Sequence, residues 1–114
     1  MTRLFLVSIV IVPATIWYAS KIAWSVYRHS TDLGCRCEED ARAWASLVLK
    51  VAGVRVILEN KAVIDSSLPQ VLVTNHVSWI DVLVLAAFVP GRYVFVAKKE
   101  VERIPVFGAA VRAC

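Results

Sequence analysis

The stretch Val73-Thr74-Asn75-His76-Val77-Ser78-Trp79-Ile80-Asp81 decides our prediction of the fold. It continues a β-branched run that starts at residue 71, and it opens an apolar segment of helical length that ends before Pro90-Gly91. A strand that leads into a helix is therefore predicted. Because open α/β sheets place their sites at the carboxyl ends of strands, this junction is also the first candidate for a functional site.

The flanking sequence extends the same pattern. Residues 54–58 and 93–97 are β-branched runs that predict two further strands around the helix expected from residue 78 to residue 88. Strand, helix and strand in this order are typical of an α/β unit. We therefore expect an α/β fold over residues 56–114, with an incomplete sheet flanked by helices.

The N-terminal part, residues 1–30, predicts a helical segment that associates with a membrane. No charge occurs from Leu4 to Ser20, a run of roughly 25 Å as a helix and slightly short for a bilayer. Continued through Tyr27 it becomes long enough for a transmembrane helix, so a span and an interfacial helix both stay open. A cleaved signal peptide fits less well, because Arg3 is the only basic residue before the apolar run.

Residues 31–55 predict a linker followed by an amphipathic helix. The acidic cluster Glu38-Glu39-Asp40 suits the first turn of that helix. From residue 41 onward an apolar stripe recurs at spacings of three and four, with Arg42 and Lys50 off the stripe. This helix can pack on the first segment or lie in the membrane interface. The stripe consists of Trp44, Leu47, Val48, Val51 and Val54.

Composition favours a lipid partner over nucleic acid. The chain of 114 residues is 59% hydrophobic, with a mean hydropathy of +0.66, against roughly 45–50% apolar residues in soluble domains. The formal net charge of +4 arises after residue 40, which suits an anionic partner such as lipid head groups or a phosphorylated substrate. Basic residues are few, scattered and not interleaved with stacking aromatics, so we expect no nucleic-acid partner.

The cysteines predict neither a metal site nor a disulfide framework. There are 3 of them, and the Cys35-Arg36-Cys37 spacing is too tight for an easy disulfide or an ordinary zinc site. We expect reduced thiols, as in cytosolic proteins. The sequence contains no cofactor fingerprint, so we expect no metal and no cofactor.

His76 and Asp81 form the candidate catalytic pair. On one continuous helix, residues separated by five positions face about 140° apart. The two side chains can meet only if His76 lies in the turn before the helix and Asp81 in its first turn. Ser78 supplies that geometry as the N-cap, since the segment from Ser78 to Asp81 has the spacing of a capping box.

A histidine oriented by a carboxylate is a good general base near neutral pH. No serine or cysteine nucleophile is needed if the substrate brings its own hydroxyl. The competing interpretation is structural: Asp81 only caps the helix and His76 is an ordinary turn residue.

Two blocks of the sequence resemble the glycerolipid acyltransferases. Asn75-His76-x-x-x-x-Asp81 is similar to the first motif of that family, in the form found in bacterial 1-acylglycerol-3-phosphate acyltransferases. The segment from Val96 to Gly108 resembles the family's Lys-x-Glu-Leu…Ile-Pro-x-Phe-Gly block at the expected distance downstream. The resemblance covers roughly residues 68–114.

The resemblance implies transfer of a fatty acyl group to the free hydroxyl of 1-acylglycerol-3-phosphate, which gives phosphatidic acid. The co-substrate would be acyl-CoA or acyl carrier protein. His76 would act as general base and Asp81 as its orienting partner, while Asn75 would support the turn. Lys99 matches the conserved lysine of the second block and would help to bind the acceptor's phosphate. Lys98 and Arg103 are weaker candidates, whose simpler interpretation is a charge exposed to solvent or head groups.

The resemblance also has departures. The family's Glu-Gly-Thr block and its proline-containing fourth block are not found in the chain. We therefore expect residues 56–114 to be the N-terminal part of a truncated acyltransferase domain, and the 114 residues to be inactive alone. The family also implies a bacterial inner membrane location, with the active site facing the cytoplasm, where thioester donors occur.

Two alternatives stay open. The first is an acyltransferase with another acceptor, such as a different lysolipid or an amino-acid-based lipid. The second is a non-catalytic, membrane-anchored protein in which His76 is dispensable.

Overall fold

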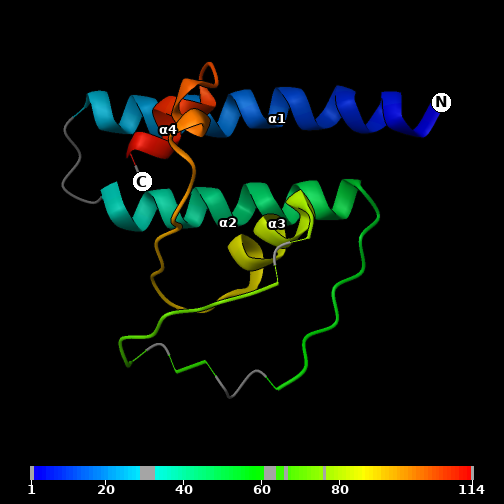
Figure 1. Ribbon diagram of the computed structural model, residues 1–114. Coiled ribbons are helices and arrows are strands. Elements are labelled where there is room, and N and C mark those ends of the chain that lie inside the picture. Colours follow the sequence, from blue (N-terminus) through cyan, green and yellow to red (C-terminus); the bar gives the residue numbers. More distant parts are fainter. Residues whose placement is uncertain (1, 29–32, 61–63, 66, 76, 114) are drawn as a thin grey trace.

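The computed structural model describes residues 2–28, 33–60, 64–65, 67–75 and 77–113. Figure 1 shows that these residues form a helical structure connected by long open loops. The elements, in chain order, are α1 (Thr2–Tyr27), α2 (Leu33–Val51), α3 (Trp79–Phe88), the 3-10 helix η2 (Lys99–Arg103) and α4 (Phe107–Ala113).

The two long helices, α1 and α2, lie side by side and antiparallel (Figure 1). Polar side chains of the two helices contact each other. The Lys21 ammonium pairs with the Asp40 carboxylate at 2.6 Å, and the Trp44 indole N–H donates a hydrogen bond of 3.0 Å to the Thr15 hydroxyl. The Thr15 hydroxyl donates in turn to the Ile11 carbonyl at 2.8 Å, two residues before Pro13 in the helix. The pair is thus held in register by side chains from both helices.

The apolar segment expected over residues 1–30 is the helix α1. A transmembrane helix, one of the two alternatives for this segment, is not found: none of the described helices is long and apolar enough to cross a membrane.

Helix α2 begins earlier than the sequence pattern predicted. It starts at Leu33, so most of the expected linker is helical and Glu38 and Asp40 lie inside the helix. Glu38 pairs with Arg42 one turn later at 2.9 Å, and Asp40 pairs with Lys21 of α1. Because both carboxylates have cationic partners that only a helix at this position brings close, the helix extends back through the acidic cluster.

Helix α3 packs on α2 through small side chains. Ala45 and Leu49 of α2 and Ala86 and Ala87 of α3 form one buried cluster. Alanine on both sides lets the two helices approach closely. The predicted helix from residue 78 to residue 88 is confirmed, since α3 has almost the same bounds.

Helix α4 packs against α1 near the start of α2. A second small cluster joins Ala19 and Ile22 of α1 to Cys37 of α2 and Ala110 of α4. Cys37 is buried and disulfide-bonded, so the prediction of reduced thiols is wrong for this residue.

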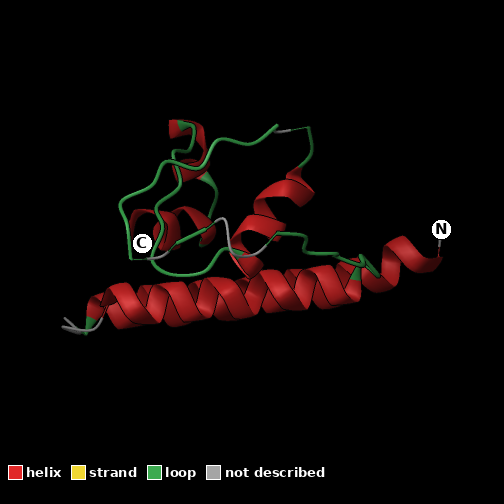
Figure 2. Cartoon of the chain, turned by 90° about the horizontal axis from the view of Figure 1, so that it is seen from below, coloured by secondary structure: helices red, strands yellow, loops and turns green. Residues whose placement is uncertain are grey.

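The expected α/β fold is wrong for this chain. The described residues contain helices and no strand, and Figure 2 shows loops where the sequence predicted a sheet. The run at residues 54–58 and the run at residues 93–97 lie on opposite sides of the molecule in Figure 1. These two runs therefore do not pair with each other as neighbouring strands.

Exposure explains why β-branched composition misled the prediction. Val71 and Val73 are 90% and 88% exposed, and Val94 and Val96 are 87% and 104% exposed. β-propensity measures how well a side chain fits a half-buried pleated surface made by neighbouring strands. Without such neighbours among the described residues, the runs are loops.

Candidate functional site

The start of α3 is closed by a capping box. Ser78 is the N-cap residue, with extended backbone angles of φ −145° and ψ 155°, and its hydroxyl accepts from the Ile80 N–H at 3.2 Å. The side chain of Asp81 accepts in return from the Ser78 backbone N–H at 2.8 Å. The capping box predicted from the spacing of Ser78 and Asp81 is therefore confirmed.

The Asp81 carboxylate points back over the turn that precedes α3. Its Oδ2 atom accepts a second hydrogen bond from the Val77 N–H, also at 2.8 Å. Two backbone donors, together with the positive end of the α3 dipole, stabilise the ionised carboxylate in this position. A carboxylate has about four acceptor sites, so these bonds are compatible with a further bond from an imidazole.

Asn75 and Val77 of the first block lie in the loop before α3. Asn75 is exposed on this loop, and the neighbouring Val77 is 90% exposed. His76 lies outside the described residues, so its pairing with Asp81 stays a prediction. What the structure establishes is the half of the arrangement that Asp81 supplies: a fixed carboxylate in the first turn of the helix.

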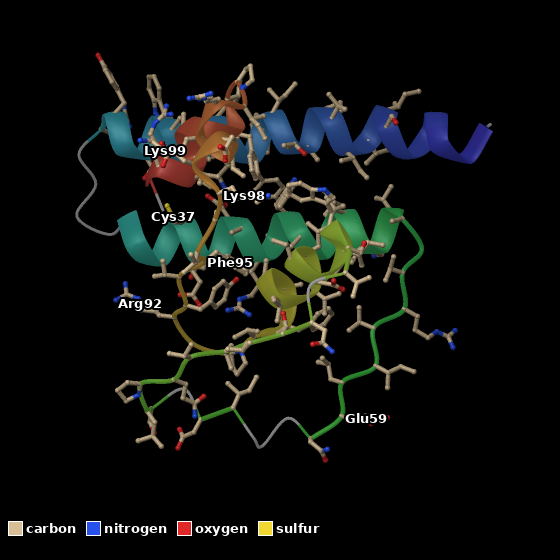
Figure 3. The ribbon with its side chains drawn as sticks, viewed as in Figure 1. Cys37, Glu59, Arg92, Phe95, Lys98 and Lys99 are labelled. Carbon is tan, nitrogen blue, oxygen red and sulfur yellow. The ribbon has the colours of Figure 1, made fainter. Side chains whose placement is uncertain are left out.

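The basic residues of the second block lie elsewhere. Lys98 is the N-cap residue of η2 without a side-chain capping bond, Lys99 begins η2, Arg103 ends it, and all three are exposed. Figure 3 shows Lys99 beside α4 and Lys98 closer to the middle of the view, on the segment that leads into η2. No described hydrogen bond or ion pair joins any of the three to Asp81. The structure therefore does not bring the two predicted parts of the site together.

The remainder of the second block is a tight turn. Gly108 N–H donates to the Ile104 carbonyl at 2.7 Å, and Val106 has a positive φ of 64°. A Cβ atom at Gly108 would lie 2.0 Å from the backbone oxygen of Glu102, so only glycine fits here. The Phe107 ring packs on Trp44 of α2, with ring centroids 5.7 Å apart. The block thus fixes η2 and α4 against the long helices.

Sequence reasoning missed two residues that hold α3. Arg42 of α2 and Tyr93, which follows α3, both donate hydrogen bonds to carbonyls at the end of α3. Arg42 was assigned only a place off the apolar stripe. A signal was present, since Glu38 stands four residues earlier and indicates an arginine held in one orientation.

Over the parts of the chain that the structure describes, no group of three or more His, Cys, Asp or Glu side chains is arranged to hold a metal ion.

Two curated relatives are similar to part of this chain. The chain is 38% identical over 71 residues to a lyso-ornithine lipid O-acyltransferase of Rhizobium meliloti (strain 1021). The matched region covers 62% of this chain and 23% of the relative. The chain is 40% identical over 62 residues to a lyso-ornithine lipid O-acyltransferase of Brucella abortus (strain 2308), covering 54% of this chain and 22% of the relative. The chain thus matches less than a quarter of the length of these relatives. No solved structure matches.

The family comparison agrees with the two sequence blocks. The profile of the family described as Acyltransferase matches residues 55–114, more than half of the chain, and includes both blocks. The resemblance found in the sequence is confirmed, and the chain belongs to the Acyltransferase family.

Proposed function

We propose that the intact gene product transfers a fatty acyl group from a thioester donor, acyl-CoA or acyl carrier protein, to the free hydroxyl of a lysolipid. The observation that carries this proposal is the Asp81 carboxylate, fixed by two backbone N–H groups at 2.8 Å in the turn directly after His76. Family membership and the names of both relatives support the same reaction class.

The proposed mechanism needs only one base. The imidazole of His76 removes the proton of the acceptor hydroxyl, whose oxygen attacks the carbonyl carbon of the thioester. An ester C–O bond forms, the C–S bond breaks, and the thiolate leaves and takes up the proton from the imidazolium. Asp81 orients the imidazole and stabilises its cationic form. No metal or cofactor takes part in this mechanism.

The acceptor we favour is lyso-ornithine lipid rather than 1-acylglycerol-3-phosphate. Both relatives bear the name lyso-ornithine lipid O-acyltransferase. Phosphatidic acid formation, which the motif resemblance implied, stays a prediction. Lys99, with Lys98 and Arg103, is proposed to bind an anionic group of the acceptor, and Asn75 to support the turn. Exposure of all four side chains leaves them accessible to such a ligand.

We also propose a membrane surface as the place of action, with the active site on the cytoplasmic side, where thioester donors occur. Helix α1 exposes a row of large apolar side chains, and Arg28 lies over the Trp24 ring at 5.5 Å. Aromatic and basic side chains together are typical of the lipid–water interface. The exposed row contains Ile9, Val12, Ile16, Trp17, Trp24 and Tyr27.

Acyl transfer from labelled oleoyl-CoA tests the proposal. Membranes that contain the intact gene product are given lyso-ornithine lipid or lysophosphatidic acid, and wild type is compared with His76→Ala. We expect faster transfer to lyso-ornithine lipid, and a rate lowered about a hundredfold or more by the substitution. His29→Ala, at the other histidine of the chain, is the matched control and should keep the wild-type rate. Equal activity of His76→Ala, or no transfer to any lysolipid, would contradict the proposal.

A further inference from the structure

The last turn of α3 is closed by side chains from outside the helix. Arg42 of α2 donates through Nη1 to the carbonyl of Ala87 at 3.3 Å and to that of Val89 at 2.7 Å. The Tyr93 hydroxyl donates to the carbonyl of Ala86 at 2.6 Å. The last carbonyls of a helix have no partner within the helix, so these bonds satisfy acceptors that would otherwise need water. We call these contacts the Arg42–Tyr93 cap.

The guanidinium of Arg42 is held on several sides. Its Nη2 atom donates to the Glu38 carboxylate at 2.9 Å and to the Gly91 carbonyl at 3.4 Å, and its central carbon lies 5.8 Å from the centre of the Tyr93 ring. The side chains of Arg42 and Glu38 are only 31% and 23% exposed. A planar fork with five donors suits this set of acceptors, whereas a lysine ammonium offers a single point of attachment.

The apolar contact between α2 and α3 does not by itself fix the position of α3 along α2. Its buried centre contains Ala45, Leu49, Ala86 and Ala87, and larger apolar side chains, Trp44, Val54, Val56, Leu83 and Val84, pack around it. Apolar contacts are non-directional, so they fix the position of α3 along α2 less specifically than hydrogen bonds do. Directional hydrogen bonds oppose sliding of α3 along α2, and at the end of α3 they come from the Arg42–Tyr93 cap. A helix of 10 residues is roughly 15 Å long and rigid, so a displacement at its end reaches its start.

The start of α3 holds the candidate base-orienting carboxylate. Asp81 is bonded to the backbone of the preceding turn, so the turn and the helix move together. We propose that Arg42 is a positioning residue for acyl transfer: by fixing α3 against α2, it keeps the turn with His76 and Asp81 in the geometry that the reaction needs. This inference rests on the proposed function. It concerns a residue outside residues 55–114, the part matched to the family.

The test uses steady-state kinetics of the intact gene product with Arg42→Met and Arg42→Lys. Rates are taken well below the unfolding temperature and are expressed per folded enzyme. We expect Arg42→Met to lower kcat about tenfold or more, with KM for both substrates within about twofold of wild type, because misplacement by about an ångström is costly in catalysis. Arg42→Lys should recover part of the loss, since an ammonium can bind some of the carbonyls. Lys50→Met, which removes an exposed cation from the same helix, is the matched control and should behave as wild type.

The pH profile separates positioning from mere stability. A nearby carboxylate raises the pKa of a histidine, so a loosened His76–Asp81 pair should move the acidic limb of kcat/KM to lower pH in Arg42→Met. A purely structural role would reduce the folded fraction and leave both kcat per folded enzyme and the profile unchanged.

If Arg42→Met keeps kcat within about twofold while His76→Ala is inactive, the proposed function stands and the positioning role is wrong. If His76→Ala is itself active, the proposed mechanism fails, and the positioning role fails with it.

Discussion

The two ends of α3 are closed in opposite ways. At its start, Ser78 and Asp81 bond to each other's backbone across three positions of an exposed turn. At its end, Arg42 reaches from α2, with 45 and 47 positions separating it from the carbonyls that accept its hydrogen bonds. The start of α3 is therefore capped by residues close in sequence, and its end is capped mainly by a residue of another helix.

The two caps therefore have different structural roles. The local cap needs only the residues around it, so it forms wherever α3 forms and holds the Asp81 carboxylate over the adjacent turn. The Arg42–Tyr93 cap acts at the other end of the helix, where the Arg42 bonds tie α3 to α2. Loss of the Asp81 charge at the start should therefore affect chemistry first, and loss of Arg42 at the end should affect both stability and placement.

Asp81→Asn should have the largest effect on activity. Asparagine keeps an oxygen that can accept the capping bonds, but it loses the charge that stabilises an imidazolium. We expect kcat/KM to fall about a hundredfold or more, while the free energy of unfolding changes by about 1 kcal/mol or less. The measurements are acyl-transfer kinetics and urea unfolding of the same preparation. A parallel loss in Asp81→Asn and in Ser78→Ala would mean that Asp81 only caps α3.

Arg42→Met should have the largest effect on stability. It leaves carbonyls at the end of α3 without their charged donor, and we expect the free energy of unfolding to fall by about 1–3 kcal/mol. The urea midpoint reports the change if the slope stays constant. Lys50→Met should leave the midpoint where it is. An equal loss in both variants would show that helix charge, rather than the cap, is responsible.

Ser78→Ala should have a moderate effect, confined to stability. It removes the hydroxyl that accepts from Ile80 N–H, which costs about 1 kcal/mol at a helix start. The Asp81 carboxylate remains, so acyl transfer per folded enzyme should stay within a fewfold of wild type. Ser78→Asp should restore the stability, because aspartate is an equally good N-cap residue. Loss of activity without loss of stability would contradict a purely capping role for Ser78.

Tyr93→Phe should have the smallest effect, and that effect should depend on pH. Burial raises the pKa of the Tyr93 phenol above its ordinary value of 10.0, against the opposing charge of Arg42. Since the folded-state pKa is the higher one, the stability contributed by this phenol is fully present below pH 10.0 and is lost as pH rises through the folded-state pKa. We expect a difference of about 1 kcal/mol between wild type and Tyr93→Phe at neutral pH, which shrinks in alkaline unfolding experiments. A difference that grows with pH would mean that the folded state stabilises the phenolate, and it would contradict the raised pKa of Tyr93.

The sequence was most informative where structure is local. The bounds of α3, its capping box and the amphipathic character of α2 could be predicted, because each depends on residues within one or two turns. The motif around His76 and Asp81 also indicated the family correctly, since two blocks in order are specific.

Structure that depends on distant partners could not be predicted. The strands were expected from valine-rich runs alone, and a strand requires a neighbour that a run does not specify. The role of Arg42 was missed for the same reason, because its acceptors belong to α3. The same contrast holds for the candidate site. Asp81 has the position that its local sequence predicted. Among the described contacts, none joins Lys98, Lys99 or Arg103 to Asp81.

The exposed valine runs have a practical consequence for handling the protein. The apolar side chains of Val71, Val73, Val94 and Val96 are exposed to solvent. No described strand pairs with the backbone of these segments. Such segments readily join the same segments of other chains and form intermolecular sheets. The 114-residue chain purified alone should therefore aggregate with increasing concentration, and a lysine at Val73 or Val96 should delay that aggregation.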